Sequence, residues 1–285
     1  MIRFDELWDY NRPEHTEQKF LEIAEQSKNN GDAGYIAELW TQIARAQGLQ
    51  GRFESANVSL DQVLVLLGEE ELPRAHVRFL LERGRVLNSS GHPARSVPLF
   101  VEAWNLAQLH NEHDFAVDAA HMLGIAEADP DTRMAWNLQA LDYAENHPEA
   151  QRWLGSLYNN IGWAQVEAGQ LEQAYDMFSL ALAFREQRGN EETISIAKWC
   201  VAKVLRLMGR VTEALEIQTS LYYKAMDQQG PTGYNCEEIA ECLLTAGRRD
   251  EAHGYFRKAY ELLSQDTWLV EHEAARLARI KELAQ

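Results

Sequence analysis

The sequence has few cysteines and few prolines, and it lacks both a long apolar run and an excess of basic residues. Only 3 of its 285 residues are cysteine, an odd number that argues against a disulfide framework and suits reduced thiols. Only 7 are proline, which favours an almost wholly helical chain. No apolar run approaches the ~20 residues that span a bilayer, and the first residues resemble no signal peptide. We therefore expect a soluble, cytoplasmic protein.

Basic residues are outnumbered, and the formal net charge is -17. A general nucleic-acid or anionic-membrane surface requires a basic face, so we expect neither as a direct partner. The composition is 46% hydrophobic and 25% charged, which supplies enough apolar material for a core and too much for a disordered chain.

Glycines recur at a nearly fixed interval of about 38 to 40 residues, with one interval twice as long. Each glycine fits the turn between two antiparallel helices, and the series is Gly51, Gly91, Gly169, Gly209 and Gly247. The double interval predicts a further pair at Phe115–Ala128 and Asp131–Ala144, which is shortened by about three residues relative to the other repeats. The sequence therefore predicts six helix pairs.

Small and large residues occupy fixed places in this register. Small residues are expected where two helices approach closely, and large ones fill the space between them. A helix pair of this size cannot bury its apolar faces alone, so the pairs must stack. The small residues of the first helices are Ala44, Gly84, Gly124, Gly162, Ala202 and Ala240, and the large residues include Trp40, Leu80, Phe100, Tyr158, Phe178 and Phe256.

The two ends of the chain differ from the repeats. Phe4, Leu7 and Trp8 form an apolar cluster that we expect to cover the first repeat, although docking to another molecule is an alternative. A first helix is predicted over 16–29, ending at the Asn-Asn-Gly sequence of residues 29–31, and a single last helix over 267–283. The expected divisions are an N-terminal leader and capping helix (1–32), six helix pairs (33–264) and a C-terminal capping helix (265–285).

The stretch 157–189 shows the repeat most clearly, with Tyr158 and Gly162 on one helix and Ala174 and Phe178 on the next. This pattern resembles the tetratricopeptide repeat family, and the resemblance covers residues 33–264. The period exceeds the usual 34 residues, which is similar to the repeats of kinesin light chains and bacterial signalling regulators. The resemblance implies an all-α, right-handed superhelical solenoid in which the first helix of each pair lines a concave groove.

The resemblance also implies which side chains line that groove. For a chain of this charge the set is unexpectedly basic, and a concave wall concentrates the field of its charges. The candidate peptide-binding residues are Arg45, Arg78, Arg85, Asn88, His121, Asn159, Trp163, Trp199, Lys203, Arg206 and Tyr234.

Two interpretations of these residues remain open. In the first, Asn159 holds the backbone of an extended peptide, the two tryptophans give apolar contact, and Lys203 and Arg206 bind a carboxylate. In the second, the basic side chains pair with acidic residues of neighbouring helices, and the tryptophans fill gaps between repeats. The acidic residues considered for this pairing are Glu38, Asp118, Glu167 and Glu237.

No motif of the sequence indicates catalysis, since it has no phosphate-binding loop, nucleophile elbow or zinc-protease helix. His110, His113 and His121 lie close together but near a link between helices, where histidine is an ordinary helix-terminal residue, so we expect no metal and no cofactor. The prediction is a non-catalytic scaffold that binds a protein or peptide segment with acidic character or a free C-terminus. The alternatives are a peptide-responsive regulator of the bacterial type and a self-assembly module such as a homodimer.

Overall fold

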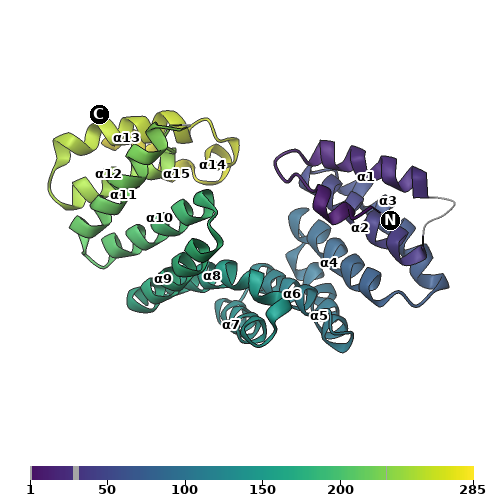
Figure 1. The fold of residues 1–285 in the computed structure, drawn as a ribbon. Coiled ribbons are helices and arrows are strands. Elements are labelled where there is room, and N and C mark those ends of the chain that lie inside the picture. The colour runs from purple at the N-terminus through teal and green to yellow at the C-terminus, as the bar shows by residue number, and fades with distance from the viewer. Residues whose placement is uncertain (1, 28–31, 229) are drawn as a thin grey trace. The chain divides into compact units, whose positions relative to one another are not determined.

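The computed structural model describes residues 2–27, 32–228 and 230–285, and all regular structure in these ranges is helical (Figure 1). The chain divides into two compact units, residues 1–157 and 158–285. No helix in the described ranges has the length and apolar character that crossing a membrane requires.

The first unit is a stack of antiparallel helix pairs that follows a short N-terminal segment. Helix α2 pairs with α3, α4 with α5, and α6 with α7, while α4 also contacts both α2 and α6. The unit consists of the 3-10 helix η1 (Phe4–Leu7), α1 (Pro13–Ser27), α2 (Ala33–Leu49), α3 (Phe53–Glu69), α4 (Pro73–Ser89), α5 (Pro93–Leu109), α6 (His113–Ala126), α7 (Pro130–Asn146), the 3-10 helix η2 (Pro148–Trp153) and the start of α8 (Leu154–Glu167).

The second unit begins within α8 and is itself a stack of antiparallel helices. Helix α10 packs against α9 and α11, and α12 packs against α11 and α13, with α15 lying on α13. The further helices are α9 (Leu171–Arg188), α10 (Glu191–Leu207), α11 (Val211–Met226), α12 (Gly233–Thr245), α13 (Arg249–Leu263), α14 (Thr267–His272) and α15 (Ala274–Leu283).

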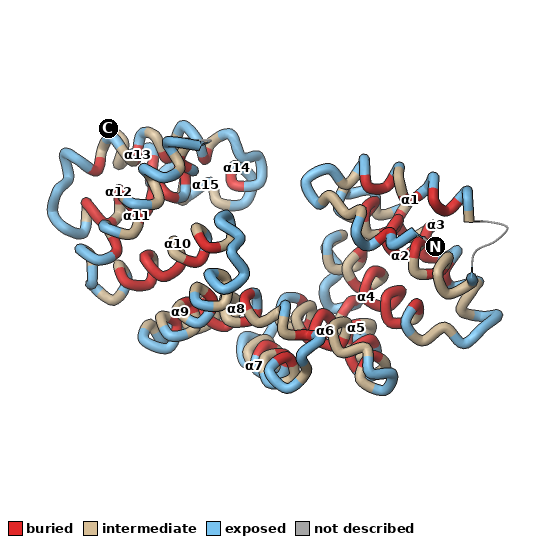
Figure 2. Tube along the Cα trace, in the orientation of Figure 1, coloured by how far each residue is buried: buried red, intermediate tan, exposed pale blue. Residues whose placement is uncertain are grey.

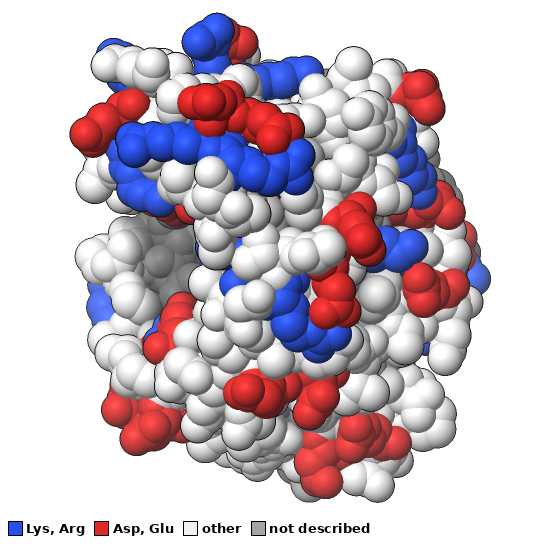
Figure 3. Space-filling model, turned by 90° about the vertical axis from the view of Figure 1, so that its left-hand side faces the viewer, with Lys and Arg blue, Asp and Glu red and all other residues white. Residues whose placement is uncertain are grey.

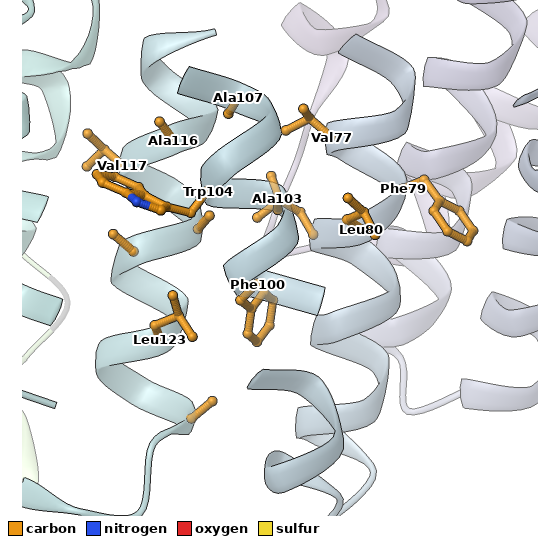
Figure 4. Packing of buried hydrophobic residues seen from close by; sticks show 14 of the residues in the cluster. Val77, Phe79, Leu80, Phe100, Ala103, Trp104, Ala107, Ala116, Val117 and Leu123 are labelled. Atoms are coloured by element: carbon orange, nitrogen blue, oxygen red, sulfur yellow. The ribbon is translucent and has the colours of Figure 1, made fainter. Parts of the chain in front are cut away.

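The core of each helix pair depends on a small residue that faces a large one. A Cβ atom on Gly84 would lie 2.4 Å from the ring of Phe100, which is fully buried. Gly162 and Phe178 repeat this contact, at 2.7 Å. Figure 4 shows Phe100 on α5, with residues of α4 on one side and Leu123 of α6 on the other. Buried positions accordingly follow the faces on which helices contact one another (Figure 2).

Two pairs place an amide where the others place an aromatic or aliphatic side chain. In the third pair Asn137 faces Gly124, and within the described residues its Oδ1 atom has no hydrogen-bond partner. In the fifth pair Gln218 is fully buried, and its Oε1 atom accepts a hydrogen bond of 2.8 Å from the Nδ2 of Asn235 on α12. Asn235 also donates to the Gln218 carbonyl oxygen at 3.1 Å.

The N-terminal segment packs on the first helices through Phe4. Its ring is 5% exposed and lies edge-on to Phe20 and Tyr35, at centroid distances of 6.0 and 5.2 Å. The Tyr35 hydroxyl donates to the carbonyl oxygen of Ile2 at 3.0 Å. The predicted end of the first helix at residues 29–31 lies outside the described residues.

The prediction of a single last helix was wrong, because the chain leaves helical geometry at Glu273, between α14 and α15. Leu269 of α14 and Leu277 and Ile280 of α15 join one buried cluster, and the break lets both short helices direct their apolar side chains toward it. A proline inside a helix does not end it in α5, where Pro98 lies within the continuous helix Pro93–Leu109.

Candidate functional site

A cavity of about 500 Å³ opens in the first unit among α2, α4, α6, η2 and the N-terminal segment. It contains three of the predicted groove residues, Arg45, Arg78 and Arg85, and its wall combines guanidinium groups with aromatic rings. The arginines that line it are Arg45, Arg74, Arg78, Arg85 and Arg152, and the aromatic residues are Trp8, Tyr10, Phe115 and Trp153.

Each of these five arginines has a carboxylate partner. Arg78 binds Asp5 at 2.6 Å and Glu38 at 2.9 Å, and Glu38 also lies 3.3 Å from Arg74. The remaining pairs are Arg45 with Glu82 at 3.3 Å, Arg85 with Glu82 at 2.6 Å and with Asp118, and Arg152 with Asp114. These basic side chains therefore pair with acidic residues of neighbouring helices, as in the second interpretation, and Glu38 and Asp118 are two of the acidic residues that it named.

Charge and burial shift the protonation equilibria of this cluster in opposite directions. Burial works to lower the pKa of Arg78, but the charges and hydrogen bonds of Asp5 and Glu38 raise it. Burial works to raise the pKa of Asp118, yet Arg85 brings it below its usual value. These groups therefore remain ionised at neutral pH.

The other two predicted residues of this unit lie on α6 and near the end of α4. His121 is half-buried, with its ring 5.3 Å from that of Trp153. Burial is the main cause that lowers the pKa of His121, so its imidazole is neutral at pH 7. Asn88 is half-buried and does not line the cavity.

In the second unit the predicted aromatic residues form a row across α8, α10 and α12. The ring centroids of Trp163 and Trp199 are 6.1 Å apart, and those of Trp199 and Tyr234 are 6.4 Å apart. The Lys203 ammonium lies 5.7 Å and 4.8 Å from the centroids of the two indoles, within the range of a cation–π contact. Asn159 is half-buried, and its Oδ1 atom lies 3.5 Å from the Cys200 thiol, which donates to it.

Lys203 and Arg206 already hold a carboxylate of this chain. Glu238 on α12, whose side chain is 2% exposed, lies 3.2 Å from Lys203 and 2.9 Å from Arg206. The neighbouring Glu237 pairs instead with Arg276 of α15. The carboxylate that the first interpretation assigned to a ligand is thus supplied from inside the fold. On the face of the molecule in Figure 3, basic side chains likewise lie beside acidic ones.

A second, more apolar cavity of about 410 Å³ lies beside the aromatic row. Trp199 and Tyr234 contribute to it together with Ile196 and Leu221. Ile196 is 48% exposed, so the cavity presents an apolar surface to solvent.

Sequence reasoning missed several residues of the first cavity. Asp5, Arg74, Phe115, Arg152 and Trp153 line it, but none occupies a groove position of the repeat. Arg152 and Trp153 belong to η2, which replaces part of the turn before α8. In the sequence, these two residues stand out only as an Arg-Trp pair that follows the shortened repeat. Such a pair does not show that the side chains line a cavity.

The cysteines and His113 lie in packed surroundings. All three cysteines are free and buried, and burial raises the pKa of Cys200 and Cys236 to about 11 and that of Cys242 to about 12. Thiols with such values are unreactive at neutral pH. His113 packs on Tyr143 and stacks on the ring of His147 at 4.2 Å. Within the described residues no group of three or more metal-ligating side chains is assembled.

No protein-family model matches the sequence, and no curated protein matches it. Solved structures do match. A signal-transduction ATPase with a tetratricopeptide repeat sensor from Pyrococcus horikoshii superposes with a TM-score of 0.75 at 12% identity over 95% of this chain and 42% of that one. BtubC (BKLC) from P. vanneervenii gives 0.64 at 16% identity over 79% and 95%. NprR in complex with its cognate peptide NprX gives 0.59 at 15% identity over 95% and 78%.

These similarities define the class of the protein by its fold. The chain has the all-α helical repeat fold of tetratricopeptide repeat proteins, as the glycine register and the small-to-large pattern of the sequence predicted. It spans less than half of the matching ATPase.

Proposed function

We propose that this chain is a non-catalytic scaffold that binds a peptide or an extended segment of a protein partner. The observation that supports this most is the open cavity of about 500 Å³, which combines five arginines with four aromatic rings. Convergent polar groups beside apolar walls are typical of recognition sites. Aromatic and arginine side chains also dominate the binding energy of protein interfaces.

The proposed ligand has acidic character, because arginine forks recognise carboxylates by paired hydrogen bonds. The aromatic row of the second unit offers a separate apolar surface for a partner. The similarity to NprR, whose structure contains its cognate peptide, favours a short peptide over a folded domain. It also favours the peptide-responsive regulator as the second candidate function.

Selection from a displayed library of random peptides on the full chain tests the proposal. We expect enriched peptides that contain acidic residues. Their affinity, measured by fluorescence anisotropy, should fall at least about tenfold in an Arg74→Ala/Arg152→Ala double variant, because these guanidinium groups line the cavity. Their side chains are 52% and 63% exposed, so the fold should persist.

The matched control is an Arg95→Ala/Arg188→Ala double variant. It removes the same amount of charge from exposed positions outside the cavity, so it should bind as the unmodified chain does. Equal losses in both variants would show that only the net charge matters, and the absence of any enriched peptide would remove the basis for the proposal.

A further inference from the structure

The five arginines of the first cavity are all paired with carboxylates of this chain, which creates a difficulty for an acidic ligand. Their partners are six carboxylates of this unit, Asp5, Glu38, Glu82, Glu112, Asp114 and Asp118. An additional carboxylate would meet like charges without a free guanidinium in the described part of the cavity. It can therefore enter only by taking the place of one already there.

Asp5 is the carboxylate whose position is the easiest to vacate. The other five are on α2, α4 and α6 or directly before α6, and their side chains are 5% to 27% exposed. By contrast, Asp5 is on η1 and its side chain is 50% exposed. Its partner Arg78 is only 5% exposed and donates hydrogen bonds to both Asp5 carboxylate oxygens, at 2.6 and 3.0 Å. Without Asp5, Arg78 would keep only Glu38, which Arg74 also contacts.

The rest of the N-terminal segment also behaves as an occupant of the cavity. Trp8 and Tyr10 line it and stack on each other at a centroid distance of 4.7 Å. The Trp8 Nε1 atom donates to the Gln42 Oε1 atom at 3.0 Å. The segment thus presents a carboxylate followed, three residues later, by an aromatic hydrogen-bond donor.

We propose that residues 2–10 are an exchangeable acidic segment, and that a partner segment of the same chemistry binds by bringing its carboxylate to Arg78 in place of Asp5. This inference rests on the proposed function, and it specifies the ligand as an acidic residue followed by an aromatic donor. It also makes the segment a competitor of the ligand. A molecule whose cavity is occupied by residues 2–10 cannot bind the partner segment. The apparent affinity for the partner is therefore the affinity of the open form multiplied by the fraction of molecules whose own segment has left the cavity.

The test uses the full chain and a labelled synthetic peptide with the sequence of residues 2–11. In an Asp5→Lys variant, the introduced ammonium group would face the Arg78 guanidinium and release the segment. We expect that variant to bind the peptide at least about tenfold more tightly than the unmodified chain, because the open fraction rises. An Asp5→Asn variant, which removes the charge alone, should lie between the two.

Glu6→Lys is the matched control. It makes the same charge change one residue away, and Glu6 pairs only with the exposed Arg3 among the described residues. Hydrogen exchange of residues 2–12 should increase in Asp5→Lys and not in Glu6→Lys. A peptide with asparagine in place of its aspartate at the Asp5 position should lose the gain in affinity.

Two results would overturn the inference. One is equal peptide affinity in the unmodified chain and Asp5→Lys, which would mean that the segment does not compete. The other is release of the segment, seen by hydrogen exchange, without binding of the peptide. In either case the proposed function would still hold if library-selected peptides bound equally well with and without Asp5. Failure of this inference can therefore be distinguished from failure of the proposed function.

Discussion

Gly84 lies against an aromatic ring of the partner helix and leaves no room for a side chain. A Cβ atom there would lie 2.4 Å from Phe100, and Phe100 is fully buried in the core. A Gly84→Ala variant should therefore lose about 1–3 kcal/mol of unfolding free energy, because overpacking forces the ring or the backbone to shift. Urea denaturation followed by circular dichroism measures this change.

Gly254→Ala provides the comparison for the same substitution. Gly254 is exposed within α13, and an added Cβ would meet no atom within 4 Å. That variant should gain about 0.5–1 kcal/mol, because alanine loses less backbone entropy in a helix. If Gly84→Ala proved equally stabilising, close packing would not explain the small residue at this position.

At the scale of the element, Glu238 joins α12 to α10 through two cations. Its carboxylate is 2% exposed and pairs with Lys203 and Arg206. Glu238→Ala should destabilise the protein by about 3–5 kcal/mol, because it leaves desolvated charges without a partner. Thermal unfolding measures the loss.

An exposed pair of the same residue types serves as the control. Glu251 lies next to Arg248 on the surface, so Glu251→Ala should leave the melting temperature unchanged. The contact of Glu238 with Lys203 and Arg206 also limits the use of these two cations in binding tests. Reversing the charges of Lys203 and Arg206 would bring two more carboxylates to Glu238, so any loss of binding would be confounded by a loss of stability.

The helix pairs could be predicted because their signals are local. The turn glycines adopt positive φ, as at Gly91 with 85°, and this conformation can be anticipated from glycine itself. The break at Glu273 and the helix η2 were not anticipated, because tertiary contacts determine them. Leu269 and Leu277 reach one cluster only if the chain bends between them.

The candidate site was less predictable than the fold for the same reason. The groove register located Arg45, Arg78 and Arg85 in one cavity, because residues on successive first helices lie side by side. It did not identify Asp5, which lies on η1, far from Arg78 in the sequence, and accepts hydrogen bonds from the Arg78 guanidinium. Pairing of Glu238 with Lys203 likewise depends on which of two adjacent glutamates faces α10.

At the scale of the whole molecule, stability should be distributed locally. In a repeat stack each repeat contacts only the repeats next to it. Phe256 is buried in a cluster drawn from α12 to α15. Phe256→Ala should therefore raise hydrogen exchange in α12–α15 and leave α2–α5 unaffected.

Phe100→Ala, in the first unit, should give the reverse pattern. Mass spectrometry of exchanged peptides resolves both regions in one experiment. A uniform increase along the chain in either variant would instead indicate a single cooperative unit.

The buried amide pair of Gln218 and Asn235 makes the repeats non-interchangeable. In the second and fourth pairs an aromatic ring faces a glycine, and one such pair can replace the other without leaving a polar group unsatisfied. At the junction of α11 and α12, any duplication, deletion or exchange of a repeat would separate Asn235 from the fully buried amide of Gln218, which would lose its hydrogen-bond partner. Repeat number should therefore be free to vary elsewhere in the chain, while this junction fixes the order of its neighbours.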